Sequence, residues 1–443
     1  MSSIARNSFY GLLGFVIPTV VMLVAYPVLV HHLGAAAFGI YILATSISGT
    51  LAFLDFGFSS ATVKLVAEDM AKEHRKAAAE VIVASLIFYG GLGALGAIGI
   101  WVLSPWLVSL FSVDPAMQAD AIGAFRLTAI QFVAFLLTTV FISLFKGLQR
   151  FELSTLVLSS LSILTYGGAT VGVLLAQVGL IGITAISLTA NLAVLVFSIA
   201  MGLSLSRASG ISLRAGRPSL ATFRRMFGFG AIMAVNTVAG LLLYKIQQYL
   251  VGALIGPVAV TIYVLAFTIA SKAHALVNAI TEVMFPLASA LKDRTRLRHV
   301  YLRMLIGSGC LALMILLPLA IFSQPILTLW VGAELAEQVT PLLPILALAC
   351  LFLSLSPAPY HVVNGIGRPG FNTWFFAMNA LTNVAVIGMF TLDHITLPGF
   401  AWAFAIANVS NSLMYQIAVE IFIWRRGLLM TESQTVHTVK VVG

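Results

Sequence analysis

Three cations of this 443-residue chain lie inside long apolar stretches of sequence, namely Arg126, Lys245 and Lys272. A charge at the centre of a lipid bilayer costs roughly 3 kcal/mol on insertion scales, so such a residue normally faces a cavity and marks a functional site. The ammonium group of lysine neutralises an anion as a point charge. If these stretches span a membrane, Lys272 and Lys245 are therefore candidate ligands of an anionic substrate.

Polar residues accompany both lysines at helical spacing. Near Lys272, the residues Ser271, His274, Asn278 and Glu282 are three and four positions apart, so a helix would place them on one face. Their amide, imidazole and hydroxyl groups can bind the hydroxyls of a polar substrate. A second stripe accompanies Lys245 and contains Asn236, Gly240, Tyr244, Gln247 and Gln248.

Two of the three cations have a simpler explanation. Lys245 is expected in the outer half of its helix, from which a long side chain can reach the membrane surface. Arg126 is expected near the outer boundary of its helix, where an arginine needs no ligand. Lys272 differs, because it lies about 15 residues, or roughly 22 Å, into its helix.

Two carboxylates are candidates for coupling transport to an ion. Asp55 lies nine residues before Lys64 and is either a proton-coupling group or the partner of a cation near the inner end of its helix. Glu282 is a similar candidate. A direct pair between Glu282 and His274 is not expected, because the two residues are eight positions apart.

A helix interrupted by prolines is predicted at SLSPAPYHVVNG, residues 354–365. Pro357 and Pro359 free backbone carbonyls, and broken helices often line cavities in membrane carriers. Tyr360 and His361 follow the break and join the candidate substrate ligands. Asparagines recur in the next two helices, where amides either hold helices together or line a path for sugars; they are Asn372, Asn379, Asn383, Asn408 and Asn411.

The composition shows which elements must position these residues. Hydrophobic residues make up 60% of the chain and charged residues 9%, whereas soluble proteins contain about 25% charged residues. The mean hydropathy is +1.04. Cys310 and Cys350 lie in apolar segments and have no metal-binding or disulfide spacing. The sequence thus predicts a membrane protein with no metal site and no cofactor.

Charge-poor stretches long enough to span a membrane recur from residue 9 to residue 424. Since a spanning helix needs about 20 mostly apolar residues, we expect an all-α protein with about twelve such helices. The predicted organisation is an N-terminal six-helix lobe over 1–205, a cytoplasmic linker over 206–220 and a C-terminal six-helix lobe over 221–443 with a short cytoplasmic tail. The predicted helices span 9–31, 36–63, 78–103, 120–145, 153–175, 179–205, 224–252, 257–290, 300–323, 338–363, 370–392 and 397–424.

The cations predict the orientation of these helices. Of the 24 Lys and Arg residues, 21 lie at the N-terminus, in alternate connections and in the C-terminal tail, whereas the opposite connections contain none. Cytoplasmic loops are enriched in Lys and Arg, so both termini are expected in the cytoplasm. The net charge of +9 therefore reflects topology and does not indicate a nucleic-acid partner.

The second half of the chain repeats the first. LGAAAFGIYILA at 33–44 matches IGPVAVTIYVLA at 255–266, and KGLQRF at 146–151 matches NGIGRP at 364–369. The Ala-Asn pair at 190–191 recurs at 407–408, and the offset drifts only from 222 to 217. Each half has an even number of predicted helices, so the two halves form a parallel repeat, as in two-lobed alternating-access carriers.

FLDFGFSSATVK at 53–64, the two Gly-x-x-Arg turns at 147–150 and 365–368 and the paired lobes together resemble the polysaccharide-transporter (Wzx-type) flippases. That family belongs to the superfamily of multidrug, oligosaccharidyl-lipid and polysaccharide exporters. The resemblance covers essentially the whole chain. It implies two six-helix bundles around a central cavity in the bacterial inner membrane.

The resemblance also implies the partners. The substrate would be an oligosaccharide repeat unit on a polyprenyl diphosphate, moved to the periplasmic leaflet for surface polysaccharide synthesis, with membrane lipids, polysaccharide-assembly proteins and a proton or sodium ion as further partners. Lysine ammonium groups would neutralise the diphosphate. A drug exporter of the same superfamily is the main alternative. Against it, residues 9–31 contain no Asp or Glu, and the charges within the membrane are cationic. An enzyme is not expected, because no outer connection carries a plausible catalytic set.

Overall fold

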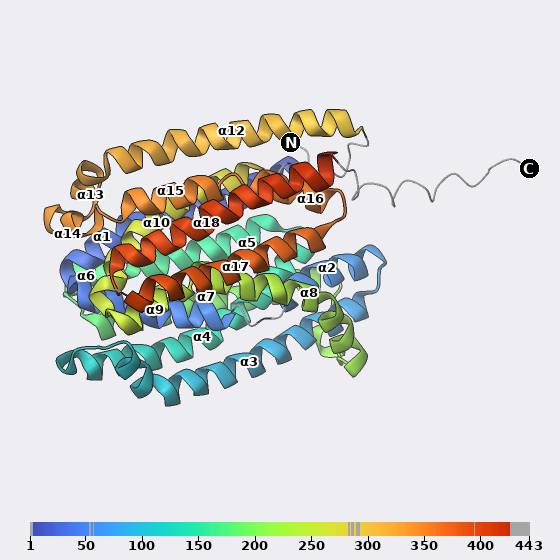
Figure 1. The fold of residues 1–443 in the computed structure, drawn as a ribbon. Helices are drawn as coiled ribbons and strands as arrows, with labels where there is room; N and C mark the ends of the chain where they lie inside the picture. Colours follow the sequence, from blue (N-terminus) through green and yellow to red (C-terminus); the bar gives the residue numbers. More distant parts are fainter. Residues whose placement is uncertain are drawn as a thin grey trace, which may run out of the picture. The chain divides into compact units, whose positions relative to one another are not determined.

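A computed structural model of the chain contains only helices among the residues it describes (Figure 1). The structure describes residues 3–52, 55, 57–281, 284, 288, 293–393 and 395–425, and their side chains except at 3–9, 52, 229–237, 294 and 391–393. The chain divides into two compact units, Met1–Ile262 and Tyr263–Gly443, and each is described by itself.

The first unit is built from long apolar helices joined by short turns. Helix α2 ends near one predicted cytoplasmic connection and α8 begins near another, and α10 continues from this unit into the next. The elements are α1 (Ser3–Ala52), α2 (Phe58–Ala71), α3 (Arg75–Leu110), η2 (Pro115–Met117), α4 (Gln118–Gly147), α5 (Phe151–Ser162), η3 (Ile163–Gly167), α6 (Gly168–Ala176), α7 (Leu180–Ala208), η4 (Leu213–Ala215), α8 (Leu220–Tyr244), α9 (Ile246–Leu254) and the start of α10 (Pro257–Thr281).

The second unit has the same kind of construction. The predicted outer connection at 324–337 is largely helical rather than an open loop, because it contains two short helices. After the end of α10, the elements are α12 (Arg294–Ile321), α13 (Ser323–Val331), α14 (Ala333–Val339), α15 (Leu343–Leu353), α16 (Pro357–Gly365), α17 (Pro369–Asp393), α18 (Leu397–Val419) and η5 (Glu420–Arg425).

Ten helices among the described residues are long and apolar enough to cross a membrane. The expected number of twelve is not confirmed. The first of these spans, Tyr10–Leu51, covers two predicted helices, which meet at a kink where Gly34 leaves the helical conformation (φ 79°, ψ 159°). The predicted helix at 224–252 is divided at Lys245 into α8 and α9.

The predicted helix at 36–63 is wrong in one respect, because it is interrupted near Asp55. Helix α1 ends at Ala52, and α2 begins at Phe58. Gly57 adopts a left-handed conformation (φ 74°) that favours glycine. The Asp55 carboxylate accepts a hydrogen bond from the Gly57 amide at 2.8 Å, so a side chain replaces the helical backbone acceptor at this point.

Two other predicted helices are irregular. The sequence indicated the first irregularity and gave no sign of the second. The predicted helix at 338–363 is divided between α15 and α16 by a turn just before Pro357, as the prolines predicted. The predicted helix at 153–175 continues through η3, a five-residue π-helical segment. Such segments are rare and are found often at functional sites.

The internal repeat is visible in local backbone geometry. Gly34 and Gly256, which the repeat pairs, both have positive φ angles, of 79° and 117°. The paired residues Tyr41 and Tyr263 are both buried, with 1% and 3% of their surface exposed. The same sequence pattern thus produces the same kink and the same buried tyrosine twice.

The second repeated motif is a helix-ending turn. Gln149 and Gly367 occupy matching positions and both have left-handed φ angles, 57° and 80°. The next amides, of Arg150 and Arg368, each donate a hydrogen bond to the carbonyl five residues earlier, at 2.8 and 3.1 Å. This is the hydrogen bond that closes a Schellman turn.

Helix α4 lies at the centre of the first unit, where it packs against α1, α2, α3 and α7 (Figure 1). Its rings at Phe125, Phe132 and Phe145 are fully buried. The approach of α3 to α4 depends on Gly96, because a Cβ atom there would lie 2.4 Å from the Phe132 ring. Small residues permit such close packing where lipid supplies no hydrophobic driving force.

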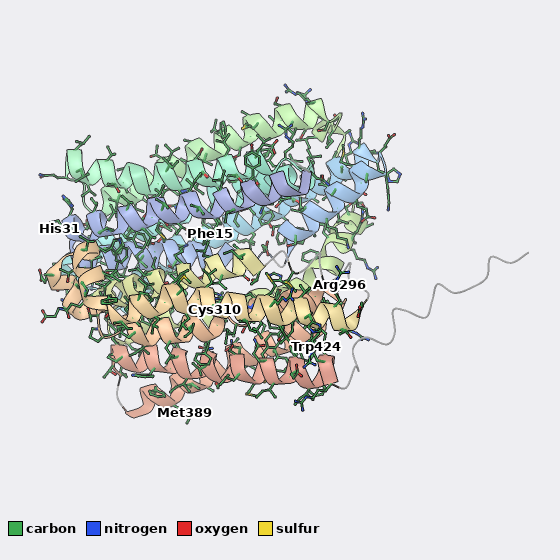
Figure 2. The ribbon with its side chains drawn as sticks, turned by 90° about the horizontal axis from the view of Figure 1, so that it is seen from above. Phe15, His31, Arg296, Cys310, Met389 and Trp424 are labelled. Atoms are coloured by element: carbon green, nitrogen blue, oxygen red, sulfur yellow. The ribbon has the colours of Figure 1, made fainter. Side chains whose placement is uncertain are left out.

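In the second unit, α18 packs against α15 and α17, while α12 packs against α15 and α16. An aromatic cluster closes one end, where the rings of Tyr301 and Trp424 stack with centroids 5.4 Å apart. Figure 2 shows Arg296 and Trp424 at this end of the unit and Met389 at the other. That placement agrees with the predicted alternation of basic connections and connections without Lys or Arg.

Large apolar side chains also face outward. Leu175 and Leu329 are 82% and 92% exposed, and Trp374 is 69% exposed. Contiguous exposure of this kind in a soluble protein would be an aggregation hazard. It fits a protein whose solvent is lipid.

Candidate functional site

Lys272 lies on α10, within the candidate membrane span Pro257–Thr281, and is half-buried. His274, two residues later, faces another helix, because its Nδ1 atom is 3.1 Å from the Ser354 hydroxyl at the end of α15. Asn278 is exposed. The predicted polar stripe of α10 therefore divides between an interhelical contact and open positions beside Lys272, while Glu282 lies outside the described residues.

Tyr360 and His361 lie on α16, directly after the break. Tyr360 is 40% exposed, and its ring meets the His361 imidazole edge to face, with centroids 5.5 Å apart. The Nε2 atom of His361 is buried and has no hydrogen-bond partner within the described chain. A buried polar atom without a partner is unusual, so this imidazole is suited to accept a ligand or a water molecule.

The asparagines of the second unit hold its helices together. The Asn372 amide donates to the Tyr360 carbonyl at 2.8 Å and to Asn364 at 2.9 Å, which fixes α17 against the end of α16. Asn379 donates to Asn408 of α18 at 3.3 Å. Of the two uses that the sequence left open, the structure shows these amides in the interhelical one.

Lys245 forms the junction between α8 and α9 and is half-buried. Gln248 is only 5% exposed, and its amide donates to the Ser46 hydroxyl of α1 at 2.7 Å. Tyr249 of α9 forms a hydrogen bond with Thr50, which also lies in α1. The start of α9 is thus tied to α1, and the side chain of Asn236 lies outside the described part of the structure.

Asp55 is surrounded by hydroxyl and amide donors rather than by a cation. Its Oδ2 atom accepts from the Ser59 hydroxyl at 2.7 Å and from the Tyr89 hydroxyl at 3.0 Å, while Oδ1 accepts from the Gly57 amide. Several donors can stabilise a carboxylate without neutralising it. The geometry gives no ion pair at Asp55 among the contacts that the structure describes.

Arg126 projects from α4 toward α3. Its guanidinium lies over the Trp101 ring, with the central carbon 5.3 Å from the ring centroid. The Nε atom is buried and has no hydrogen-bond partner in the described residues. A cation–π contact of this kind contributes about 0.5–2 kcal/mol, so Arg126 has a structural role whatever its part in binding.

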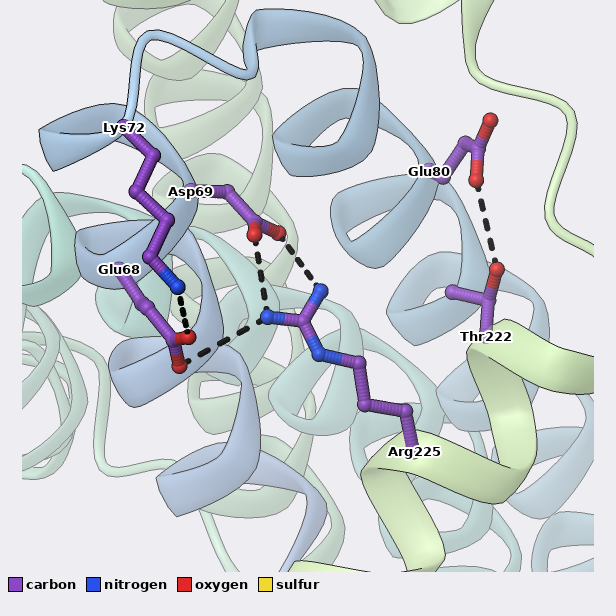
Figure 3. Close-up of polar contacts among 6 residues, drawn as sticks. All are labelled: Glu68, Asp69, Lys72, Glu80, Thr222 and Arg225. Atoms are coloured by element: carbon purple, nitrogen blue, oxygen red, sulfur yellow. Dashed lines mark hydrogen bonds and ion pairs between the residues drawn. The ribbon is translucent and has the colours of Figure 1, made fainter.

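Sequence reasoning missed an ionic cluster at the end of the first unit (Figure 3). Arg225 of α8 donates from both terminal nitrogens to the Asp69 carboxylate of α2, each at 3.0 Å. The Asp69 side chain is only 4% exposed. Glu68 lies 3.7 Å from Arg225 and accepts a hydrogen bond from Lys72 at 2.7 Å. Arg225 and Asp69 are 156 positions apart in sequence, so no local pattern could have indicated their pairing.

The cluster also changes ionisation at this end. The hydrogen bond from Lys72, helped by the charge of Arg225, lowers the pKa of Glu68, and the Asp69 carboxylate raises the pKa of Arg225. A second contact of α8 is made with α3, where the Thr222 hydroxyl donates a hydrogen bond to Glu80 at 3.4 Å (Figure 3).

Among the described residues, no group of three His, Cys, Asp or Glu side chains could hold a metal ion. Cys310 is exposed, Cys350 is buried, and both are free thiols. The substrate candidates fall into separate parts of the chain, with Arg126, Lys245, Gln248 and Asp55 in the first unit and Lys272, His274, Asn278, Tyr360 and His361 in the second.

Known transporters share this fold. A multidrug resistance MATE family transporter of the MOP superfamily, in an inward-facing conformation, superposes with a TM-score of 0.82 at 15% identity, over 95% of this chain and 99% of the other. The lipid II flippase MurJ in an inward closed conformation superposes with a TM-score of 0.73 at 15% identity, over 94% and 87% of the two chains. At these identities the likeness establishes the fold alone.

Sequence comparison gives a closer relationship. A protein of Shigella flexneri named "Putative O-antigen transporter" is 22% identical over 417 residues, which cover 94% of this chain and 97% of that protein. Residues 4–292 match the family described as "Polysaccharide biosynthesis protein". The match spans more than half of the chain and agrees with the resemblance found in its motifs. The chain therefore belongs to the polysaccharide biosynthesis protein family.

Proposed function

We propose that this protein is a flippase that moves a polyprenyl-diphosphate-linked oligosaccharide from the cytoplasmic to the periplasmic leaflet by alternating access. The observation that carries the proposal is a half-buried cation, Lys272, within a membrane-spanning helix of a chain from this family. The names of two relatives, an O-antigen transporter and a lipid II flippase, support transport of a lipid-linked glycan. Those relatives are transporters rather than enzymes.

The charge at Lys272 suits the part of the substrate that is hardest to move. A diphosphate carries negative charge through the low-dielectric interior of the membrane, where an unpaired charge is very unfavourable. An ammonium group offsets that charge. Groups of the same unit with hydrogen-bonding capacity, the Asn278 amide, the Tyr360 hydroxyl and the His361 imidazole, would bind the first sugars.

The other expectations remain part of the proposal. Lys245, Gln248, Asn236 and Arg126 would contribute to the substrate path, while Asp55 and Glu282 would couple movement to protons or sodium. The cationic connections support an inner-membrane protein with both termini in the cytoplasm. Two lobes, over 1–205 and 221–443, would move relative to each other to alternate access.

The test begins by deleting the gene in its host and labelling the lipid-linked oligosaccharides of each leaflet. We expect the intermediates to accumulate on the cytoplasmic leaflet, surface polysaccharide to disappear and the intact gene to restore both. Lys272→Ala should insert at native abundance but fail to restore export, since it removes the cation. Lys272→Arg should restore part of the export. Lys76→Ala, at an exposed cation in the first turn of α3, should restore all of it.

A second candidate is a cation-coupled multidrug exporter, which the likeness to the MATE transporter favours. In that case the deletion would leave glycan intermediates on the periplasmic leaflet and increase sensitivity to drugs. Full export by Lys272→Ala at native abundance would instead retain the flippase and remove Lys272 from its binding site.

A further inference from the structure

A cavity of about 210 Å³ lies in the first unit, and neither Lys245 nor Lys272 lines it. Four elements line it, namely α1, α4, α7 and the helix that runs from α5 into η3. None of its eleven lining residues is charged, and eight of them carry a hydroxyl or amide group. In a membrane protein, so many polar groups around one space require an explanation, because each is costly to leave without a partner.

Two of these groups have unused hydrogen-bonding capacity. Thr165 is only 7% exposed, and its hydroxyl is buried with no hydrogen-bond partner in the described residues. The side-chain oxygen of Gln131 is also buried without a hydrogen-bond partner in the described residues. Since a buried polar atom without a partner is unusual and costly, a ligand or water molecules with hydrogen-bonding groups must occupy this space.

The backbone at Thr165 is also unusual. Thr165 and Tyr166 lie in the π-helical segment η3, which widens the helix locally and places both residues at the cavity. A π-helical turn is less stable than an α-helical one and is commonly retained where it serves a site. This observation is independent of the unpaired atoms and indicates the same place.

The lining also indicates the chemical class of the ligand. An ion is disfavoured, because no carboxylate or cation lines the cavity to compensate its charge. The ligand must accept and donate hydrogen bonds, since the lining includes amides at Gln131 and Asn191 and hydroxyls at Tyr41 and Ser48. The rings of Phe135 and Tyr166 add aromatic surface for an apolar face.

We propose that this cavity is a binding site for a sugar ring of the glycan, separate from the site that binds the diphosphate. Sugars combine many hydroxyls with apolar C–H faces and carry no obligatory charge. The volume is below the ~300–1,000 Å³ of pockets for drug-sized ligands, so one ring would fit rather than a whole repeat unit. The identity of the glycan rests on the proposed function, whereas the cavity and its chemistry do not.

Three substitutions test the cavity directly. Gly49 lines it, and a Cβ atom at that position would meet no atom within 4 Å. Gly49→Leu therefore fills the cavity without a backbone clash. Thr165→Val and Gln131→Leu remove the unpaired polar atoms with little change of shape. Matched controls are Gly11→Leu, at an equally open glycine on the exposed part of α1, and Thr189→Val, at an exposed threonine of α7.

The probe is the host's repeat-unit oligosaccharide, freed from its lipid and diphosphate by mild acid. Saturation-transfer NMR would measure its contact with the purified full-length protein in detergent. We expect a signal with the wild-type protein, with both controls and with Lys272→Ala. The signal should fall at least threefold in Gly49→Leu and in the Thr165→Val, Gln131→Leu double variant.

Three results would overturn the inference. The first is an undiminished signal in both cavity variants, and the second is no signal with a wild-type protein that transports the glycan; in either case the proposed function stands without this site. The third is a cavity variant that keeps glycan contact but loses binding of radioactive sodium, which would make the cavity an ion site. Failure of the proposed function is distinguishable, because export would then not depend on the gene at all.

Discussion

At the scale of single residues, Asp55 has a structural contact and a proposed coupling role that can be tested separately. Its carboxylate accepts a hydrogen bond from the Gly57 amide at the start of α2 and from the hydroxyls of Ser59 and Tyr89. The structural contact needs an oxygen atom, whereas the proposed coupling to protons needs a titratable group.

The substitution Asp55→Asn distinguishes the roles. An asparagine keeps the oxygen that accepts from Gly57, so we expect the unfolding temperature to change little. It cannot release a proton near neutral pH, so we expect proton-driven transport to fall at least tenfold. Asp55→Ala should lose both, with a cost of about 1 kcal/mol for the missing hydrogen bond to the Gly57 amide.

These effects can be measured as thermal unfolding in detergent and as transport into proteoliposomes with and without a pH gradient. Tyr89→Phe is the control, because it removes one hydrogen bond and leaves the carboxylate. If Asp55→Asn transports as well as the wild type under a pH gradient, Asp55 has only a structural role and does not couple transport to protons.

At the scale of elements, the contact between α2 and α8 includes a bidentate ion pair. Arg225 and Asp69 form two hydrogen bonds of 3.0 Å, and the carboxylate is almost fully buried. Geometry of this kind makes an ion pair strong, whereas exposed pairs contribute little. The Lys72–Glu68 pair beside it is largely exposed and is expected to add less.

We expect Arg225→Ala to destabilise the protein by about 2 kcal/mol, because it leaves the buried Asp69 carboxylate without its charged partner. The double variant with Asp69→Asn should recover part of the loss. Thermal unfolding of the two single variants and the double variant gives the coupling between the residues. Independent, additive effects would contradict the assigned ion pair. Lys72→Ala serves as the exposed control.

The same cluster predicts a dependence on acid. The pKa of Glu68 is lowered in the folded protein, so its contribution is present above the usual carboxyl pKa of about 4.3 and is lost as the pH falls through the lower folded value. Unfolding measured from pH 6 to pH 3 should show a smaller decline in Glu68→Gln than in the wild type. An identical decline would exclude Glu68 from the effect.

At the scale of the whole molecule, the basic connections predict which ends of the helices face the cytoplasm. Lys76 lies in a connection rich in cations, and Glu334 lies in one without any. Both residues are exposed, and the chain contains only two cysteines, so single reporter thiols can be introduced after Cys310 and Cys350 are replaced.

In intact cells, a membrane-impermeant maleimide should label Glu334→Cys and leave Lys76→Cys unmodified. After the membrane is permeabilised, both variants should react. The positive-inside rule gives this result if both termini lie in the cytoplasm. Labelling of Lys76→Cys alone in intact cells would reverse the orientation and with it the proposed direction of transport.

The features that could be predicted from the sequence are those set by local composition. Apolar runs predicted the membrane spans, and the prolines at 357 and 359 predicted the division between α15 and α16. The repeat was visible because the two halves share short motifs at a nearly constant offset.

The features that could not be predicted depend on distant partners or on side chains that replace backbone acceptors. The break at Asp55 has no proline, and it exists because a carboxylate takes the place of a helical carbonyl. The Arg225–Asp69 pair and the sugar-sized cavity join helices far apart in the chain. Spacing placed Gln248 beside Lys245 but gave no sign of its hydrogen bond to Ser46 in another helix.

The two matching Schellman turns differ in the residue that takes the left-handed conformation. Gly367 holds a left-handed backbone without steric cost, but Gln149 holds the same conformation with a side chain, at a cost of roughly 1–2 kcal/mol. The repeat therefore contains the same turn twice, once with a relaxed backbone at Gly367 and once with a strained backbone at Gln149.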